Sequence, residues 1–261
     1  MLLKGVKAML QIKEVTFGLG RPKLVVPLTA KNQTTLVEQA KIAQNSAAQI
    51  VEWRADLFDE YETFEEIVAQ LAILRQELPN KLLLFTFRTQ SEGGARQLSL
   101  SDYEKLCLLV AKSRQVDLID LELRHVEFLG RGFVQAIKHE HVYIVMSAHY
   151  FDGTPKDGHL LFQIGLMNQF QADIGKIAAM PDTLSDVLRM MMIIERAKGL
   201  NQLPLAMMSM GDLGKISRVG SEAMGSVFTF GALEEVSAPG QIPIEDMSRF
   251  IERLAIKKDE V

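Results

Sequence analysis

One lysine in this sequence stands where a solvent-exposed side chain is not expected. Lys176 lies in the run DIGKIAAMP, which is otherwise dominated by apolar residues. Burial and neighbouring cations lower the pKa of an amine, and a neutral amine beside a carbonyl group forms an imine. Lys176 is therefore a candidate nucleophile for carbonyl chemistry. The sequence leaves a structural alternative open, in which Lys176 is held in an ion pair with Asp120 or Glu122.

A histidine ends another apolar run. His149 directly follows VYIVMSA and is suited to act as a general acid or base near neutral pH. A histidine at the end of a strand can also be a hydrogen-bonded structural residue, and the sequence alone does not decide between the two. Its pairing with an imine-forming lysine on the next predicted strand favours the chemical role.

Further polar residues alternate with apolar ones in the same kind of run. Because side chains of a strand point alternately to its two faces, each run has one polar and one apolar face. The polar faces carry Glu52 and Arg54, Thr86 and Arg88, Asp120 and Glu122, and Ser147 and His149. Burying so many charges is costly unless they are paired. They form either a set of structural ion pairs or, as we favour, a polar active site at the ends of barrel strands.

The elements that position these residues are eight short apolar runs separated by helical patterns. The runs predict strands at 24–30, 50–56, 82–88, 117–123, 142–149, 173–180, 204–210 and 226–231. Capping boxes at Thr63/Glu66 and Ser101/Glu104 predict the starts of two of the helices between them. This alternation predicts an α/β fold, a (β/α)8 TIM barrel that forms a single domain over residues 1–261. Residues 9–20 are expected to form an N-terminal hairpin that closes the barrel floor.

Composition narrows the possible partners. The chain has 261 residues, a formal net charge of -4 and one cysteine. No basic excess indicates nucleic-acid binding, and no apolar run is long enough to cross a membrane. A single cysteine cannot form an internal disulfide, which favours a reducing, cytoplasmic setting. No histidine pair or cysteine cluster has metal-ligand spacing, so we expect neither a metal nor a cofactor.

Across its full length the sequence resembles the type I 3-dehydroquinate dehydratases of the shikimate pathway. Each matching segment is short, and their order and spacing make the resemblance specific. The segments are EWRAD (52–56), TFRTQSEGG (86–94), DLEL (120–123), SAHYF (147–151), GKIAAMP (175–181), MSMG (208–211), ISRVG (216–220) and SAPGQ (237–241).

The resemblance implies a hydro-lyase that dehydrates 3-dehydroquinate to 3-dehydroshikimate, in aromatic amino acid biosynthesis, by syn elimination through a Schiff base. The residue matching the family lysine is Lys176, which attacks the C3 ketone. His149 matches the histidine that removes the C2 proton and then protonates the departing C1 hydroxyl. Glu92 matches the acid that orients this histidine.

The resemblance also assigns residues to substrate binding. Arg218 matches the arginine that binds the carboxylate, with Ser237 and Gln241 as its partners. Glu52, Arg54 and Arg88 match residues that hold the ring hydroxyls. The apolar wall of the pocket matches Met208, Met210, Phe230 and Ala238. Asp120 and Glu122 are expected to support these residues rather than to bind substrate.

Two other functions stay open at this point. A different imine-forming barrel, such as a class I aldolase, shares the lysine but does not need this combination of His149, Arg218 and SAPGQ. A non-catalytic barrel that binds the metabolite has no need of a buried amine. The resemblance further implies a homodimer, and the glycines of SEGG (91–94) are expected to form a mobile lid.

Overall fold

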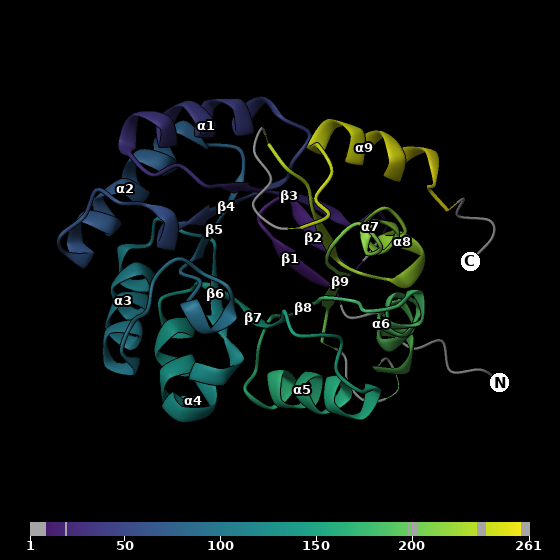
Figure 1. The fold of residues 1–261 in the computed structure, drawn as a ribbon. Helices are drawn as coiled ribbons and strands as arrows, with labels where there is room; N and C mark the ends of the chain where they lie inside the picture. The colour runs from purple at the N-terminus through teal and green to yellow at the C-terminus, as the bar shows by residue number, and fades with distance from the viewer. Residues whose placement is uncertain (1–8, 19, 198, 200–202, 234–238, 257–261) are drawn as a thin grey trace.

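The computed structural model describes residues 9–18, 20–197, 199, 203–233 and 239–256. Its centre is an eight-stranded parallel sheet in the order β10-β3-β4-β5-β6-β7-β8-β9 (Figure 1). The strands are β3 (Lys23–Leu28), β4 (Ile50–Arg54), β5 (Leu82–Thr86), β6 (Leu118–Glu122), β7 (Tyr143–Tyr150), β8 (Ile174–Ala179), β9 (Leu205–Ser209) and β10 (Phe228–Phe230). The sheet curls round until β9 and β10 meet, where the backbone N–H of Val227 donates to the carbonyl of Leu205 at 2.8 Å. The predicted (β/α)8 barrel is confirmed.

Helices surround the sheet on its outer side, as Figure 1 shows. They are α1 (Gln33–Asn45), α2 (Phe64–Glu77), α3 (Leu100–Ser113), α4 (Leu123–His139), α5 (Asp157–Gln169), α6 (Leu184–Ala197), α7 (Lys215–Val219), α8 (Ser221–Met224) and α9 (Ile244–Arg253). Among the described residues, no helix combines the length and the apolar character that a membrane span requires.

The predicted helix starts were right in one case and wrong in the other. The capping box of Thr63 and Glu66 opens α2 as expected. The box of Ser101 and Glu104 is wrong, because Ser99 caps α3 and accepts from the N–H of Asp102. The sequence patterns also did not predict α4, which contains a break at Gly130, where φ is 78° and ψ is -175°.

Apolar side chains pack on both faces of the sheet. The outer face packs against the helices, and Trp53 of β4 lies there in edge-to-face contact with Phe58 and Phe85. The lumen has a separate apolar cluster, which includes Val25 and Leu84. Part of this second cluster, including Ile50, Leu82 and Ile174, lies at the end of the lumen at which the strands begin.

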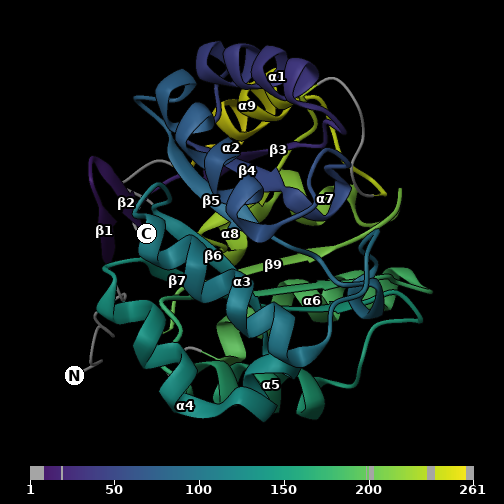
Figure 2. The same ribbon diagram turned by 90° about the vertical axis from the view of Figure 1, so that its left-hand side faces the viewer.

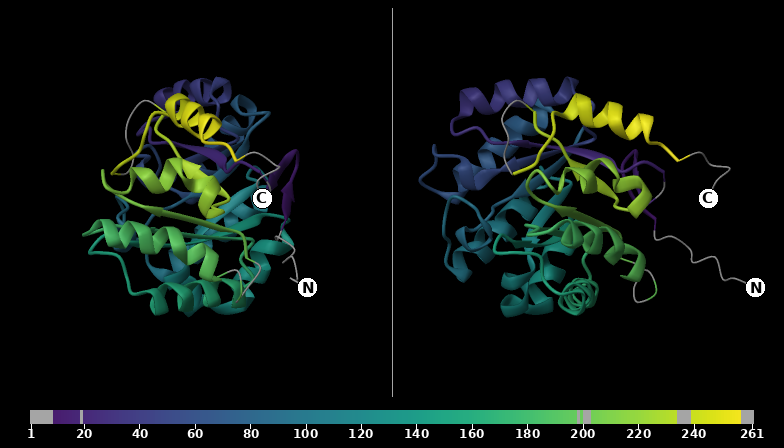
Figure 3. Two further views of the ribbon diagram at one scale, coloured as in Figure 1. Left: turned by 90° about the vertical axis from the view of Figure 1, so that its right-hand side faces the viewer. Right: turned by 45° about the vertical axis from the view of Figure 1, so that its right-hand side comes forward.

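A hairpin of β1 (Leu10–Ile12) and β2 (Val15–Phe17) lies against that end of the barrel (Figures 2 and 3). Ile12 and Phe17 are buried and belong to the apolar cluster of the lumen. Since one end of the lumen is filled with apolar side chains, the polar residues of the strands are left at the other end, where the strands finish.

Candidate active site

A pocket opens where the barrel strands end. Its wall contains every predicted site residue that the structure describes, whereas Ser237 and Ala238 lie outside the described residues. The predicted residues in the wall are Glu52, Arg54, Arg88, Glu92, His149, Lys176, Met208, Met210, Arg218, Phe230 and Gln241. Strand alternation and the family resemblance together therefore selected residues from separate strands and loops that converge on one cavity.

The wall also contains residues that the sequence reasoning did not assign to the site. They are Gly93, Phe151, Ala178 and Pro239. Ala178 shares the lumen face of β8 with Lys176, so strand alternation could have identified it. Gly93 has a φ of 81°, and a Cβ there would lie 2.4 Å from the ring of Phe151. No sequence pattern indicates that contact, because it joins two different loops.

Lys176 is only 5% exposed and its amine faces the pocket from β8. Its Nζ lies 3.4 Å from Oε1 of Glu52 and 3.3 Å from Oδ2 of Asp120. It also lies 4.5 Å from the centre of the Phe230 ring. Charge-assisted hydrogen bonds are usually shorter, about 2.7–2.9 Å. The carboxylates therefore compensate the charge of the amine without closely fixing its position.

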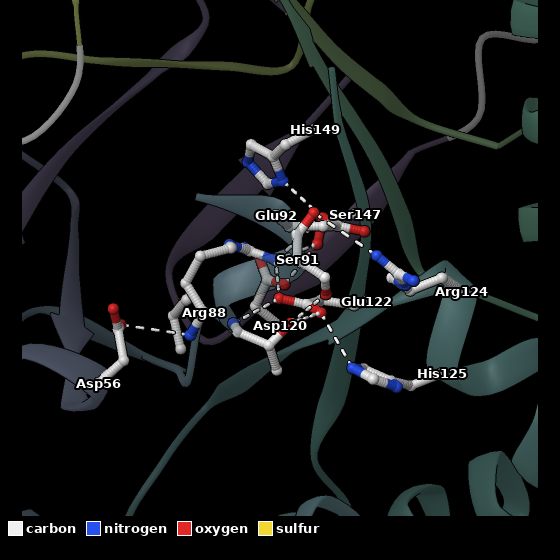
Figure 4. A network of polar contacts seen from close by, with 12 residues as sticks. Asp56, Arg88, Ser91, Glu92, Asp120, Glu122, Arg124, His125, Ser147 and His149 are labelled. Carbon is white, nitrogen blue, oxygen red and sulfur yellow. Dashed lines mark hydrogen bonds and ion pairs between the residues drawn. The ribbon is translucent and has the colours of Figure 1, made fainter. Parts of the chain in front are cut away.

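Arg88 organises the acidic groups of the lumen (Figure 4). Its Nη2 pairs with Oδ2 of Asp120 at 2.8 Å, and its Nη1 with Oε1 of Glu122 at 3.0 Å. Ser147 links the same groups, since its hydroxyl accepts from Nη1 of Arg88 at 3.0 Å and donates to Asp120 at 2.5 Å. Burial favours a neutral Asp120, but Arg88 and Lys176 outweigh it and hold the pKa of this carboxyl below its ordinary value. The guanidinium of Arg88 is thus a fixed structural charge beside the lysine.

His149 and Glu92 form a close pair, with Nδ1 of His149 2.8 Å from Oε2 of Glu92 (Figure 4). Burial raises the pKa of Glu92 to about 8, although Arg88 acts in the opposite direction. Burial, together with the nearby cations Arg88, Lys176 and Arg54, lowers the pKa of His149 well below its ordinary value. At neutral pH the proton of the pair therefore lies on the carboxyl and the imidazole is neutral.

Arg218 of α7 is a second buried cation, 2% exposed, with a different environment. Its Nη1 contacts Sδ of Met208 at 3.5 Å, and its Nη2 donates to the carbonyl of Pro239 at 3.3 Å. Among the described residues no carboxylate pairs with it, and burial lowers its pKa to about 10. A buried guanidinium without an acidic partner is a favourable site for a carboxylate of a ligand.

Arg54 and Glu52 lie at the end of β4. Two parallel hydrogen bonds of 2.8 Å, from Nε and Nη2, hold the guanidinium of Arg54 to the carboxylate of Asp56. Glu52 accepts a hydrogen bond from the hydroxyl of Thr86 at 2.9 Å. Asp56 is fully buried and does not line the pocket, and the sequence reasoning gave it no role.

The comparisons with known proteins agree with this arrangement. Residues 24–258 match the family model described as type I 3-dehydroquinase. The 3-dehydroquinate dehydratase of Bacillus licheniformis is 36% identical over 249 residues, covering 94% of this chain and 97% of that protein. The enzyme of the same name from Escherichia coli is 39% identical, covering 90% of this chain and 94% of the relative.

Solved structures show the same likeness. The type I 3-dehydroquinate dehydratase of Clostridium difficile, solved with covalently modified comenic acid, is 35% identical with a TM-score of 0.90, covering 95% of this chain and 98% of that one. The 3-dehydroquinate dehydratase of Geobacillus kaustophilus is 31% identical with the same TM-score, covering 95% and 96% of the two chains. With its barrel, its buried lysine and its paired histidine, this chain belongs to the type I 3-dehydroquinase family.

Proposed function

We propose that this chain dehydrates 3-dehydroquinate to 3-dehydroshikimate through a Schiff base on Lys176. One observation carries the proposal: a buried lysine and a neutral histidine face the same pocket, which also holds a cation that no described carboxylate pairs with. A nucleophilic amine, a general base and a carboxylate site are what this elimination requires.

The reaction begins at the lysine. The neutral amine of Lys176 attacks the C3 ketone, and loss of water from the resulting carbinolamine leaves a protonated imine. The imine withdraws electrons from C2 and makes its proton more acidic. With Glu92 ionised and accepting from Nδ1–H, Nε2 of His149 then removes the C2 proton, and the electron pair of that C–H bond moves into an enamine.

The same histidine completes the elimination. The enamine electrons form the C1–C2 double bond as the C–O bond at C1 breaks, and the leaving hydroxyl takes the proton from His149 and departs as water. Hydrolysis of the imine then releases 3-dehydroshikimate and restores Lys176. One residue serves as base and acid because both steps take place on one face of the ring.

The remaining residues bind the substrate and shape the pocket. Arg218 receives the substrate carboxylate, with Gln241 and Ser237 as the further residues that the family resemblance places there. Glu52 and Arg54 hold ring hydroxyls, and Met208, Met210, Phe230 and Ala238 are assigned to the apolar wall. Arg88 is engaged by Asp120, Glu122 and Ser147, so we assign it mainly to organising the proton-transfer pair.

The competing functions make different use of these groups. A class I aldolase needs the lysine but breaks a carbon–carbon bond, and it has no need of an arginine such as Arg218, which no described carboxylate pairs with, for a ring carboxylate. A non-catalytic binding protein gains nothing from placing His149 against Glu92 within reach of the same pocket. The combination of groups favours the dehydratase.

Incubation with 3-dehydroquinate and borohydride, followed by peptide mass spectrometry, tests the covalent step. We expect a reduced adduct on Lys176. An adduct on another residue, or turnover without any adduct, would exclude the imine mechanism. In His149→Ala the adduct should still form, while dehydration falls by about 100-fold or more. Near-normal dehydration by this variant would remove His149 from the mechanism.

We also propose that the chain forms a homodimer, as the family resemblance implies. The surface that suits a second copy is an apolar face on α6, where Leu184, Leu188 and Met192 recur every fourth residue and are 59, 53 and 52% exposed. Ile216 of α7, a helix that contacts α6, is exposed as well. Sedimentation velocity of Leu188→Glu should give a monomer, and an unchanged dimer would place the interface elsewhere.

A further inference from the structure

Asp56 is a buried acid that belongs to no part of the chemistry described so far. It lies two residues after the end of β4, in the middle of the short 3-10 helix Ala55–Leu57, and its side chain is fully buried. Its carboxylate holds the guanidinium of Arg54 by two parallel hydrogen bonds of 2.8 Å. Burial disfavours a charged Asp56, but the bond to Arg54 outweighs it and lowers the pKa of the carboxyl. Asp56 therefore fixes the plane of an arginine that faces the pocket.

The same carboxylate also receives two backbone N–H groups from another segment. Oδ1 accepts from the N–H of Arg88 at 3.2 Å, and Oδ2 accepts from the N–H of Ala95 at 3.1 Å. Figure 4 shows the first of these contacts. Each carboxylate oxygen thus accepts one bond from Arg54 and one from this segment. Arg88 and Ala95 lie at the two ends of the segment that carries Glu92.

Backbone hydrogen bonds within the 88–95 segment and with the adjoining Arg96 hold it in a closed loop. The N–H of Gly94 donates to the carbonyl of Thr89 at 2.9 Å, and the N–H of Gln90 donates to the carbonyl of Arg96 at 2.9 Å. A Cβ at Gly94 would lie 1.7 Å from the carbonyl oxygen of Arg88, so the two ends approach as closely as the backbone allows. The lid motion expected from these glycines stays a prediction, and the contacts of Asp56 and of the segment itself oppose it.

We propose that Asp56 is a positioning residue that sets two parts of the active site with one carboxylate: the guanidinium of Arg54, and the 88–95 segment that holds Glu92 against His149. This inference rests on the proposed function. Substrate binding through Arg54 and proton transfer through His149 are then coupled through a residue that contacts neither the substrate nor the reacting atoms.

The substitution Asp56→Asn tests the proposal, because it keeps the shape of the side chain and removes half of its acceptor capacity. The amide nitrogen would face N–H donors of Arg54 and of the backbone, so only one oxygen can still accept. We expect KM to rise about 10-fold and kcat to fall about 10-fold, with the far-ultraviolet circular dichroism unchanged. Wild-type values of both constants in a folded Asp56→Asn would overturn the proposal.

Asp59→Asn is the matched control. Asp59 pairs with Arg96 at 2.7 Å near the same segment, but its side chain is 61% exposed and it does not line the pocket. This variant should keep both kinetic constants. If it lowered activity as much as Asp56→Asn does, the effect would belong to any charge near the segment and the proposal would fail.

A purely structural role is separated from positioning by double mutants. If Asp56 acts through Glu92, then Asp56→Asn should lower kcat much less in a Glu92→Gln background than in the wild type. If it acts through Arg54, then it should raise KM little in an Arg54→Lys background. Full additivity in both backgrounds would show that Asp56 acts only through general stability.

Asp56→Glu provides a second variant if the asparagine does not fold. The longer side chain keeps its charge, and the flexible Arg54 can follow the displaced oxygens whereas the backbone N–H groups cannot. We expect KM near the wild-type value and kcat lowered about 10-fold. Unchanged kcat would contradict the role in holding the segment. Borohydride trapping on Lys176 should persist in every variant, and its absence in the wild type would refute the proposed function rather than the role of Asp56.

Discussion

The pairing of His149 with Glu92 predicts how activity depends on pH, through the position of a single proton. Nδ1 of His149 faces Glu92, so on the proposed mechanism Nε2 must accept the proton from C2. Nε2 is a free acceptor only when Nδ1 carries the ring proton and Glu92 is ionised. A protonated Glu92 donates to Nδ1 instead, which leaves the ring proton on Nε2 and makes the histidine unable to act as the base.

The raised pKa of Glu92 sets the size of the effect. With a pKa of about 8, Glu92 is ionised in about 10% of molecules at pH 7 and in about 1% at pH 6. Wild-type kcat/KM should therefore rise roughly tenfold for each pH unit below 8 and become level above it. In Glu92→Gln the amide oxygen accepts from Nδ1–H at every pH, so this acid limb should disappear.

The assay follows the ultraviolet absorbance of the conjugated product across this pH range at low substrate concentration. Glu127→Gln is the control, since Glu127 is an exposed acid on α4 and should leave the acid limb unchanged. A wild-type profile that is flat between about pH 6 and pH 8 would refute the assignment of the proton to Glu92. An acid limb that persists in Glu92→Gln would assign the titration to another group.

Three further predictions follow from burial in the same structure. Because the folded state raises the pKa of Glu92 from 4.5 to about 8, its stabilising contribution is lost progressively as pH rises from about 4.5 to about 8, by a total on the order of 5 kcal/mol. Glu92→Gln should therefore gain stability over the wild type between about pH 5 and pH 8 in urea unfolding, with the difference level above pH 8, and a pH-independent difference would contradict this. Arg218→Ala should weaken substrate binding about 10- to 100-fold without lowering Tm, whereas a lower Tm with unchanged binding would make Arg218 structural. Trp53→Ala should reduce the free energy of unfolding by about 3–5 kcal/mol, and a loss below about 1 kcal/mol would show that the cavity refills.

Strand alternation predicted much of the site because, in a closed barrel, alternate residues of every strand point toward the same central lumen. Residues of one parity point into the lumen, so Glu52, Thr86, Asp120 and Lys176 were placed correctly without any knowledge of their partners. The same rule could not predict which charges pair. Arg88 contacts groups from β6, β7 and its own loop, and those distances depend on how the strands are staggered.

Asp56 shows where alternation fails. It has the same parity as Glu52 and Arg54, so an extended strand would direct it into the lumen. The strand ends at Arg54 and a 3-10 helix begins at Ala55, which places Asp56 under the 88–95 segment instead. Helix α4 was missed although its buried residues Val126, Phe133, Val134 and Ile137 keep helical spacing across Gly130, so its pattern was present in the sequence.

The two buried arginines of the pocket explain why a net charge of -4 is compatible with an anionic substrate. The positive charge of Arg88 is neutralised by ion pairs with Asp120 and Glu122, so this arginine stabilises the arrangement of the lumen side chains. Among the described residues no carboxylate pairs with Arg218, so a ligand carboxylate there would offset part of the free energy that burial of the guanidinium costs. A carboxylate that binds Arg218 therefore gains more than one that approaches Arg88. On the proposed function, this difference favours binding of the substrate carboxylate beside Arg218 of α7, in the pocket that Lys176 and His149 also line.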